Sequence, residues 1–387
     1  MKRNPHFVLR ELSGVPYLLP FGHGIASHDR GMQLNETGVF LWNSLKEEHS
    51  ADELIRLCAR HYEATEEEEK ELAEDLKPFL ADLVKSGALL PDGDPWDFHA
   101  PLQKTMSIAG QIIALEGPAE IFSDRFDPFL LPASSGNAKP DLTISAFAGI
   151  SPYQNAGNLI LRNAMMSVLE CSDCFEIWFH ANQQLKECIL TKDASHAIFY
   201  YRLPCGEILT EEVFHGIREA FLYLAGLKGM VALHSTSILY QGKAWLFSGH
   251  SGMGKSTHAK LWQESYQVPL LNGDLNLLGT ENGEPVIYGI PWCGTSGIFD
   301  IATHPLGGIT LLSRAPSNFV TELSPDLQIL LVDQRLISHS WTEELFDRNL
   351  DVIKKIAPKI LICKLSCTKD PEAATVMKER IDRFLMA

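Results

Sequence analysis

Apolar residues at helical spacing dominate the first part of the chain. Asn35 precedes the first such stretch, and Ser50 or Asp52 precedes the second. Thr65 precedes the third and forms, with Glu68, the pattern of a capping box. Hydroxyl, carboxylate and carboxamide side chains in these places satisfy the free N–H groups of a first helical turn. The pattern therefore predicts three helices, which follow short extended runs.

Apolar runs without helical spacing come next and are separated by turn residues. These runs are 107–109, 111–115, 141–144 and 198–201. Short runs of this kind predict β-strands, and apolar residues at helical spacing in 211–227 predict a helix after them. No set of residues suited to catalysis stands out here, so we expect a structural, β-rich segment.

The last part of the chain mixes strand and helix patterns. Residues 234–238 and 244–247 are typical of two strands of a hairpin with Gly242 at its turn. A third strand is expected over 268–272, ending in Gly273 and Asp274. An acidic side chain at such a strand end is well placed to meet Mg²⁺ or a substrate hydroxyl.

These patterns divide the chain into three segments, 1–98, 99–228 and 229–387, with the turn-forming run 91–95 as the first linker. At 387 residues the chain is long enough for each segment to have its own core. The expected fold class is a multidomain α+β and α/β protein.

A glycine-rich stretch between the strand 244–247 and the following helix meets the requirements of a phosphate-binding loop. It consists of Gly249, His250, Ser251, Gly252, Met253, Gly254, Lys255, Ser256 and Thr257. The glycines let the backbone curl so that its N–H groups point at phosphate oxygens. Lys255 supplies a cation to the β- and γ-phosphates, and Ser256 is placed to bind Mg²⁺. We therefore expect this loop to bind a nucleoside triphosphate together with Mg²⁺, and ATP is the first candidate.

Charge and cysteine content exclude several other classes of protein. The formal charge of −16 argues against general binding to nucleic acid or to an anionic membrane. The N-terminus lacks the apolar core of a secretion signal, and no apolar run approaches a membrane span, so a cytoplasmic location is expected. Cys171 and Cys174 form the only CxxC pair. Without a second pair we expect reduced thiols and neither zinc nor a disulfide framework.

The apolar spacing of the first segment resembles the PqqD-like family of small winged-helix peptide chaperones. The residues that carry the resemblance are Leu34, Asn35, Glu36, Thr37, Gly38, Leu41, Trp42, Leu54, Tyr62, Leu76, Phe79, Leu80, Leu83, Gly87, Ala88 and Leu89. The resemblance implies that residues 1–98 bind the leader of a precursor peptide, which adds as a strand to the edge of a small sheet. The alternative is that this segment is a winged-helix domain that serves only for interaction or dimerisation. The protein could also form a homo-oligomer. DNA binding is disfavoured because the helices lack a basic stripe.

The third segment resembles the HPr kinase-like family, which shares a nucleotide core with phosphoenolpyruvate carboxykinases. The resemblance is carried by the strand with His234, the loop 249–257, the strand ending at Asp274 and the turn Pro291, Trp292, Cys293, Gly294 and Thr295. It implies that Lys255 binds the β- and γ-phosphates, that Ser256 and Asp274 hold the metal, and that Asp274 orients or deprotonates the acceptor hydroxyl. His234 would support Asp274. The β-rich second segment looks like the N-terminal portion of the same family.

One position departs from the family pattern. Related chains place two acidic residues together after this strand, whereas the first position here is Gly273. Asn272 or Asn276 can contribute an oxygen ligand in its place. Arg314 is a further candidate for binding phosphate. Pro291 and Gly294 are expected to shape a loop near the nucleotide, with Trp292 packed under that loop. Cys293 lacks a partner base that would make it a nucleophile.

Together these expectations favour an ATP-dependent kinase that phosphorylates a serine hydroxyl of a ribosomally made precursor peptide held by the first segment. Phosphoryl transfer needs positioning and neutralisation of charge more than covalent chemistry. The first alternative, supported by Gly273, is a catalytically weak nucleotide-binding partner in peptide maturation. The second is a kinase of free serine or of a carrier protein.

Overall fold

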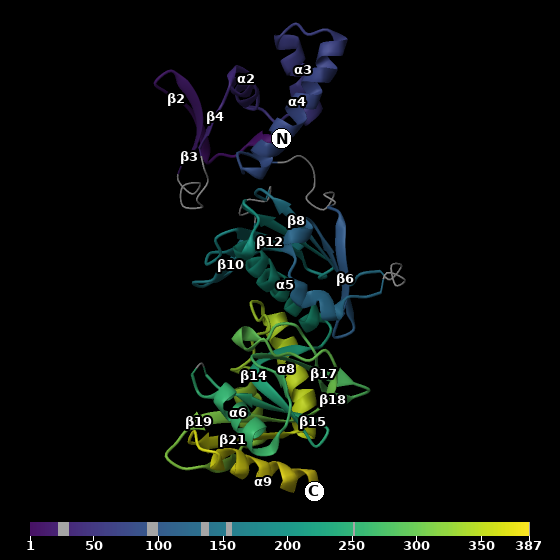
Figure 1. Cartoon of the computed structure of the whole chain (residues 1–387), viewed down its shortest axis with the longest axis vertical. Coiled ribbons are helices and arrows are strands. Elements are labelled where there is room, and N and C mark those ends of the chain that lie inside the picture. Colours follow the sequence, from purple (N-terminus) through teal and green to yellow (C-terminus); the bar gives the residue numbers. More distant parts are fainter. Residues whose placement is uncertain (22–30, 91–99, 133–138, 152–156, 251, 387) are drawn as a thin grey trace.

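The computed structural model describes residues 1–21, 31–90, 100–132, 139–151, 157–250 and 252–386. Helices and sheets are mixed along the chain, and they lie in three tiers along its long axis (Figure 1). We call these the N-terminal tier (residues 1–90), the middle tier (100–227) and the C-terminal tier (228–386). The linker expected at 91–95 and the loop residue Ser251 lie outside the described residues.

The N-terminal tier joins three helices to short strands. The strands are β1 (Lys2–Arg3), β2 (Phe7–Leu12), β3 (Val15–Pro20), β4 (Met32–Gln33) and β5 (Leu89–Leu90), and the helices are α2 (Glu36–Ser44), α3 (Ala51–His61) and α4 (Glu66–Lys85). β2, β3 and β4 form an antiparallel sheet in that order, and β1 pairs with β5. A core of its own, which includes Leu18, Leu41, Leu54 and Leu80, holds this tier together.

The capping side chains explain where the three helices begin. Asn35 accepts the N–H of Gly38 and starts α2. Ser50, and not Asp52, starts α3, because its side chain accepts the N–H of Glu53 in a capping box. Thr65 and Glu68 form the second capping box, at α4, as the sequence predicts. The glutamates of the first turn of α4 lie at the N-terminus of the helix, where the positive end of the helix dipole stabilises negative charge.

The middle tier is an eight-stranded sheet covered on one face by a long helix. Its strands are β6 (Leu102–Ile108), β7 (Gln111–Glu116), β8 (Leu142–Ala148), β9 (Asn158–Arg162), β10 (Met166–Glu170), β11 (Cys174–Phe179), β12 (Leu185–Thr191) and β13 (His196–Tyr201), in the order β6-β7-β8-β13-β12-β11-β10-β9. The helix is α5 (Glu207–Leu227), which begins four residues before the expected start at 211. The earlier start buries Leu209 against the sheet.

The C-terminal tier contains β14 (Val231–Tyr240), β15 (Lys243–Ser248), α6 (Lys255–Tyr266), β16 (Leu270–Asn272), β17 (Leu275–Glu281), β18 (Glu284–Tyr288), β19 (His304–Arg314), β20 (Phe319–Glu322), α7 (Pro325–Asp333), α8 (Glu343–Ile356), β21 (Leu361–Cys367) and α9 (Glu372–Met386). The sheet order is β15-β14-β17-β18-β19-β21-β20, with β16 also on β14 and β15 also on β19. Gln241 and Gly242, both with positive φ, make the turn of the expected β14–β15 hairpin.

One hydrophobic core joins the middle and C-terminal tiers through α5. It contains the inward residues of the middle sheet and of α5 together with Leu275, Tyr288 and Trp292 from the C-terminal tier. Trp292 is 2% exposed, stacks on Phe221 and donates its indole N–H to the carbonyl of Phe214 at 3.0 Å. The second and third segments of the sequence therefore share a hydrophobic core.

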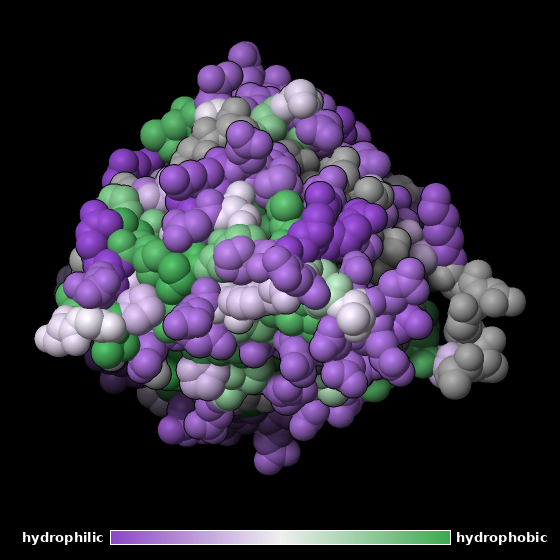
Figure 2. All heavy atoms as spheres, turned by 90° about the horizontal axis from the view of Figure 1, so that it is seen from above, coloured by the Kyte–Doolittle hydropathy of each residue, from purple (hydrophilic) through white to green (hydrophobic). Residues whose placement is uncertain are grey.

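Contacts also fix the N-terminal tier against the middle tier. A Cβ atom built on Gly149 would come within 2.9 Å of the carbonyl oxygen of Val84 in α4, and one built on Gly87 would overlap the guanidinium of Arg202. The end surface of the N-terminal tier is mostly polar, with apolar patches between the polar side chains (Figure 2). None of the helices in the described ranges combines the length and apolar character needed to cross a membrane.

We predict that Trp292→Ala destabilises the middle and C-terminal tiers together, because the cavity would open in their shared core. The expected loss is about 3–5 kcal/mol in the free energy of unfolding, the usual cost of removing a buried tryptophan. Denaturant unfolding followed by circular dichroism measures it. Phe346→Ala on α8, where the side chain is 41% exposed, is the control and should change stability little. Equal stability of Trp292→Ala and the wild-type protein would contradict the shared core.

Candidate functional site

The glycine-rich loop connects the end of β15 to the start of α6, next to the sheet. Gly252 and Gly254 have φ angles of 74° and 100°, in the left-handed region that favours glycine. His250 accepts the N–H of Met253, and the guanidinium of Arg314 donates to the carbonyl of Gly252. Arg314 thus lies at the loop, as expected for a phosphate-binding candidate. Ser251 lies outside the described residues.

Lys255 is the first residue of α6 and points back under the loop. Its side chain is buried, and Nζ lies 3.4 Å from the carbonyl oxygen of Gly249. Burial lowers the pKa of Lys255, while the nearby carboxylate of Asp274 raises it. The lysine therefore gives the site a desolvated cation beside the loop and facing an acid. Ser256 and Thr257 follow it in the first turn of the helix.

A cavity of about 190 Å³ opens beside the loop. It is lined by Met253, Gly254, Thr257, His258, Leu261, Arg314, Ala315, Cys367, Thr368 and Lys369. Its walls come from the loop, from α6 and from the chain after β19 and β21. Apolar walls with a few polar groups are typical of pockets for small organic ligands.

His258 forms a rigid wall of this cavity. It is 3% exposed, its Nε2 accepts the indole N–H of Trp262 at 3.1 Å, and its ring packs edge-on against Phe247. Burial lowers the pKa of His258 to about 4. The ring is therefore neutral at physiological pH, with its proton on Nδ1 because Nε2 is the acceptor. This histidine supports the pocket and does not titrate there.

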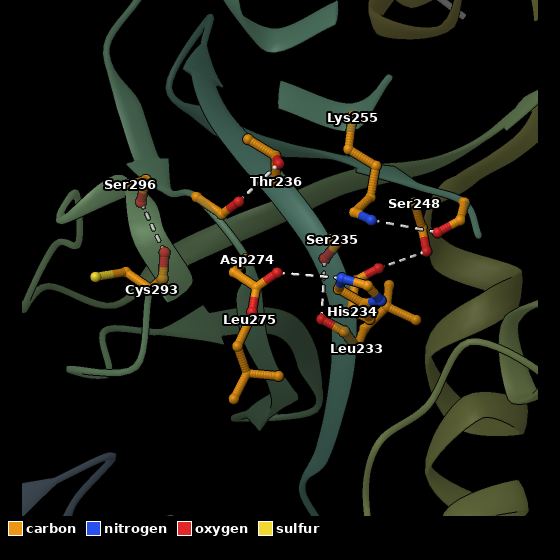
Figure 3. A network of polar contacts seen from close by, with 12 residues as sticks. Leu233, His234, Ser235, Thr236, Ser248, Lys255, Asp274, Leu275, Cys293 and Ser296 are labelled. Atoms are coloured by element: carbon orange, nitrogen blue, oxygen red, sulfur yellow. Dashed lines mark hydrogen bonds and ion pairs between the residues drawn. The ribbon is translucent and has the colours of Figure 1, made fainter. Parts of the chain in front are cut away.

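His234 and Asp274 form the acidic end of the site. Nε2 of His234 lies 3.1 Å from Oδ1 of Asp274, and Figure 3 shows the two side chains pointing toward one another. The hydrogen bond from His234 is the main cause that lowers the pKa of Asp274, and the charges of His234 and Lys255 lower it further. Ser248 anchors the histidine backbone by donating to its carbonyl at 2.7 Å. Asp274 is therefore held as a carboxylate.

Asp274 follows the end of a strand, as the sequence predicted: β16 ends at Asn272, and Gly273 and Asp274 link it to β17. β16 and β17 both pair with β14, and the register is the same on the two sides of Asp274, with Asn272 opposite Ser237 and Leu275 opposite His234. The N–H of Ser235 donates to the carbonyl of Asp274 at 2.9 Å. Backbone pairing to β14 thus resumes directly after the acid, and β14 holds Asp274 in the link between β16 and β17.

The side-chain oxygens of Asn272 and Asn276, the two asparagines considered as metal ligands, accept hydrogen bonds from other groups of the protein. Oδ1 of Asn272 accepts the N–H groups of Asp274 and Leu275, at 3.0 and 3.1 Å. Oδ1 of Asn276 accepts the hydroxyl of Ser237 at 2.6 Å, and both asparagines are buried. Their oxygens shape the strand interruption around Asp274, so neither replaces the acid that is missing at position 273.

Packing explains why position 273 is glycine. A Cβ atom built there would overlap the hydroxyl of Ser296, lie 2.5 Å from its Cβ and lie 3.3 Å from the carbonyl of Cys293. Ser296 itself is fixed, since it donates to that carbonyl at 2.7 Å and accepts the N–H of Ile298. The turn 293–297 therefore occupies the space that a second acidic side chain would need.

The turn residues are placed partly as expected. Gly294 has a φ of 61°, and a Cβ atom on it would lie 2.8 Å from Cβ of Asp274, so the turn does adjoin the acid. Trp292 packs against Phe221 and Phe214 of α5, in the core shared with the middle tier. Burial raises the pKa of the Cys293 thiol, which does not favour a nucleophile.

Other cysteines and acids add no metal site among the described residues. All eight cysteines are free thiols, and burial raises the pKa of Cys171 and Cys174. Groups of three or more histidine, cysteine, aspartate or glutamate side chains suited to a metal ion are absent from the part of the chain described here.

Two arginines near Asp274 could not be found from the sequence. Arg218 on α5 is close enough for its charge to lower the pKa of Asp274. Arg335 follows α7, and its carbonyl accepts the N–H of His234 at 3.1 Å. Neither lies in a motif, and both are brought to the site by tertiary packing alone.

Comparison with known proteins gives two likenesses. Residues 25–89 match the family described as Coenzyme PQQ synthesis protein D (PqqD), so a PqqD domain lies near the N-terminus. Among solved structures, the HPr(Ser) kinase/phosphatase from Coxiella burnetii is 14% identical, with 40% of this chain and 97% of that chain covered and a TM-score of 0.23. A TM-score this low supports no structural argument. No curated protein is similar enough to count as a match.

We predict that Gly273→Asp destabilises the protein by about 1–3 kcal/mol, the usual cost of overpacking. The clash is with Ser296, so the double variant Gly273→Asp with Ser296→Gly should recover part of the loss. Thermal unfolding of the three proteins measures this. Gly206→Ala is the control, because a Cβ atom there meets nothing within 4 Å. A Gly273→Asp protein as stable as the wild type would refute the packing argument.

We predict that His234→Ala raises the pKa of Asp274 toward its ordinary value of 3.8. In the wild-type protein the lowered pKa contributes stability above pH 3.8, which is lost as the pH falls through the folded-state value. Carboxyl ¹³C NMR titration measures the change. Asp300, which pairs with His304 at 2.8 Å, serves as an internal control. An unchanged titration of Asp274 would mean that His234 does not hold it ionised.

Proposed function

We propose that the chain is an ATP-dependent kinase that phosphorylates a serine hydroxyl of a precursor peptide bound by its N-terminal tier. The observation that carries the proposal is the His234–Asp274 pair facing a buried Lys255 at the base of a glycine-rich loop. A cation and a fixed carboxylate on opposite sides of one space are the groups that phosphoryl transfer to a hydroxyl requires.

Asp274 would receive or orient the proton of the acceptor hydroxyl. Its depressed pKa makes it a weak base, which suits a reaction whose transition state needs little deprotonation of the nucleophile. His234 would keep the carboxylate ionised and correctly turned. Lys255 would neutralise the charge on the β- and γ-phosphate oxygens. The turn at Gly294 would limit the space beside Asp274 to a small side chain, which favours serine.

Magnesium fits the donors present. Mg²⁺ prefers oxygen ligands and takes one or two protein groups together with phosphate oxygens and water. The carboxylate of Asp274 and the hydroxyl of Ser256 are of this kind, and a cage of protein ligands is not required. When bound, the ion would supply charge neutralisation between the phosphates.

The cavity of about 190 Å³ would take the nucleoside end of ATP. It begins at Gly254 and Thr257, at the helix end where phosphates are expected, and extends away to apolar side chains such as Leu261. A triphosphate lying across the loop would then point its terminal phosphate toward Lys255 and Asp274.

The N-terminal tier would bring the peptide. Residues 25–89 match PqqD, and β2 is an edge strand of the three-stranded sheet, six residues long. An edge strand offers backbone N–H and C=O groups for an added peptide strand. Leu12 at the end of β2 and Phe21, which lies beside the start of β2, are exposed and can add apolar contacts.

A nucleotide-binding partner with weak or no transfer is the second candidate. It is favoured by the closure of position 273 by Ser296, which leaves Asp274 without an acidic neighbour at that point. Such a protein would bind ATP and peptide and change their assembly without forming a phosphoester.

The test is transfer of the labelled γ-phosphate of Mg·ATP to a precursor peptide. We expect Lys255→Ala and Asp274→Asn each to lower the rate by about 100-fold or more, as for other groups that stabilise a transition state. Lys260→Ala is the matched control, because this lysine lies on the same helix, is exposed and pairs with the exposed Glu264 at 3.6 Å. ATP binding without transfer to any precursor would favour the second candidate.

Added leader peptide distinguishes a tethered peptide from a free substrate. Free leader should raise the apparent KM for the full precursor and leave kcat unchanged, because it competes only for the N-terminal tier. Phosphorylation of free serine that is indifferent to the leader would instead indicate a metabolite kinase.

A further inference from the structure

The backbone of Arg335 lies beside His234, although Arg335 follows the glycine-rich loop by some eighty residues of sequence. It comes directly after α7, where Leu336 forms a bridge with Leu233 of β14. The carbonyl of Arg335 accepts the N–H of His234 at 3.1 Å. The backbone of this arginine is therefore anchored to the same strand that carries the acidic end of the site.

The guanidinium of Arg335 reaches from this anchor to the glycine-rich loop. Its Nη2 donates to Nε2 of His250 at 3.0 Å, and its Nη1 donates to the carbonyl of Gln334 at 3.2 Å. A guanidinium can only donate, so Nε2 of His250 must be the acceptor and carries no proton in this contact. Arg335 thus links the loop to the strand through a neutral histidine.

The third nitrogen of the guanidinium lacks a partner. Nε of Arg335 is buried and has no hydrogen-bond acceptor among the described residues. A buried donor on a charged group costs free energy when it is left unsatisfied. Nε of Arg335 therefore needs an acceptor, and the described residues do not supply one. A phosphate oxygen at the adjacent loop would be such an acceptor.

We propose that Arg335 is a further catalytic residue, which binds the terminal phosphate of the nucleotide and pairs with His250 only when that phosphate is absent. The inference rests on the proposed kinase function and adds a residue to it. Nε and Nη2 lie on one side of the guanidinium and form a fork that matches two oxygens of one phosphate. Only the contact to His250 has to be exchanged, since Nη1 stays on Gln334.

The terminal phosphate is the acceptor that the layout favours. The apolar cavity lies at the other end of the loop, against α6 and the chain after β21. Arg335 is tied to His234, at the end where Lys255 and Asp274 meet. Arg314 donates to Gly252 and lines the cavity, so it serves the opposite end. A phosphate anion is also a stronger acceptor for a guanidinium than a neutral imidazole.

The experiment compares the binding of Mg·ATP and Mg·ADP to the full chain by calorimetry. Arg335→Ala should weaken ATP binding by about 10- to 100-fold, the range expected for hydrogen bonds to a charged group, and change ADP binding by less than about threefold. Arg335→Lys keeps the charge without the fork and should recover only part of the ATP affinity. Lys255→Ala should weaken both nucleotides. Arg348→Ala, an exposed arginine on α8 paired with Glu344, is the matched control.

The outcomes separate this proposal from the kinase function itself. Undiminished preference for ATP over ADP in Arg335→Ala, with transfer to peptide intact, would overturn the role of Arg335 and leave the kinase. Equal loss of ATP and ADP binding would also overturn it, because Arg335 would then support only the shape of the loop. Absence of nucleotide binding by the wild-type chain would refute both. Circular dichroism of each variant checks the fold, and Arg335→Lys provides the comparison if Arg335→Ala does not fold.

Discussion

The pairing of β14 with β16 and β17 is the constraint on which the rest of the candidate site depends. One register places Asn272 opposite Ser237 and Leu275 opposite His234, which leaves Asp274 beside the histidine. The other edge of β14 pairs with β15, whose last residue leads into the glycine-rich loop. Because a shift of one residue would turn every side chain to the other face, the histidine, the acid and the loop are positioned by one set of backbone hydrogen bonds.

Local chemistry in the sequence predicted much of this, and tertiary packing decided the rest. The caps at Asn35 and Thr65 are local, since each acts on a backbone N–H three residues away, and both were predicted correctly. The hairpin turn at Gly242 is local in the same way. The continuation of pairing past Asp274 depends on β14, forty residues earlier, and the spacing of apolar residues gives no sign of it.

The omissions at the site have the same origin. The sequence did not identify the partners of Trp292, because this residue packs against Phe221 of α5 in a core formed from two segments. Arg335 belongs to no motif and reaches the loop because α7 ends beside β14. From the sequence, Gly273 could be interpreted only as a missing carboxylate. In the structure, the turn at Ser296 occupies the space that any side chain at position 273 would need. Sequence patterns report local geometry, and these positions are determined by neighbours that are distant in sequence.

The order of the tiers bears on how a site with a single acid can still be selective. The middle tier lies between the N-terminal tier and the strands that carry the candidate site (Figure 1). Under the proposed function, a peptide held at β2 must span the middle tier before its hydroxyl reaches Asp274, and an extended chain covers at most about 3.3–3.6 Å per residue. A spacer that is too short gives no effective concentration of the acceptor, and a matching one raises it to about the millimolar range. Selection then depends on the length of the peptide as well as on the pocket, so the catalytic groups need little affinity for the acceptor of their own.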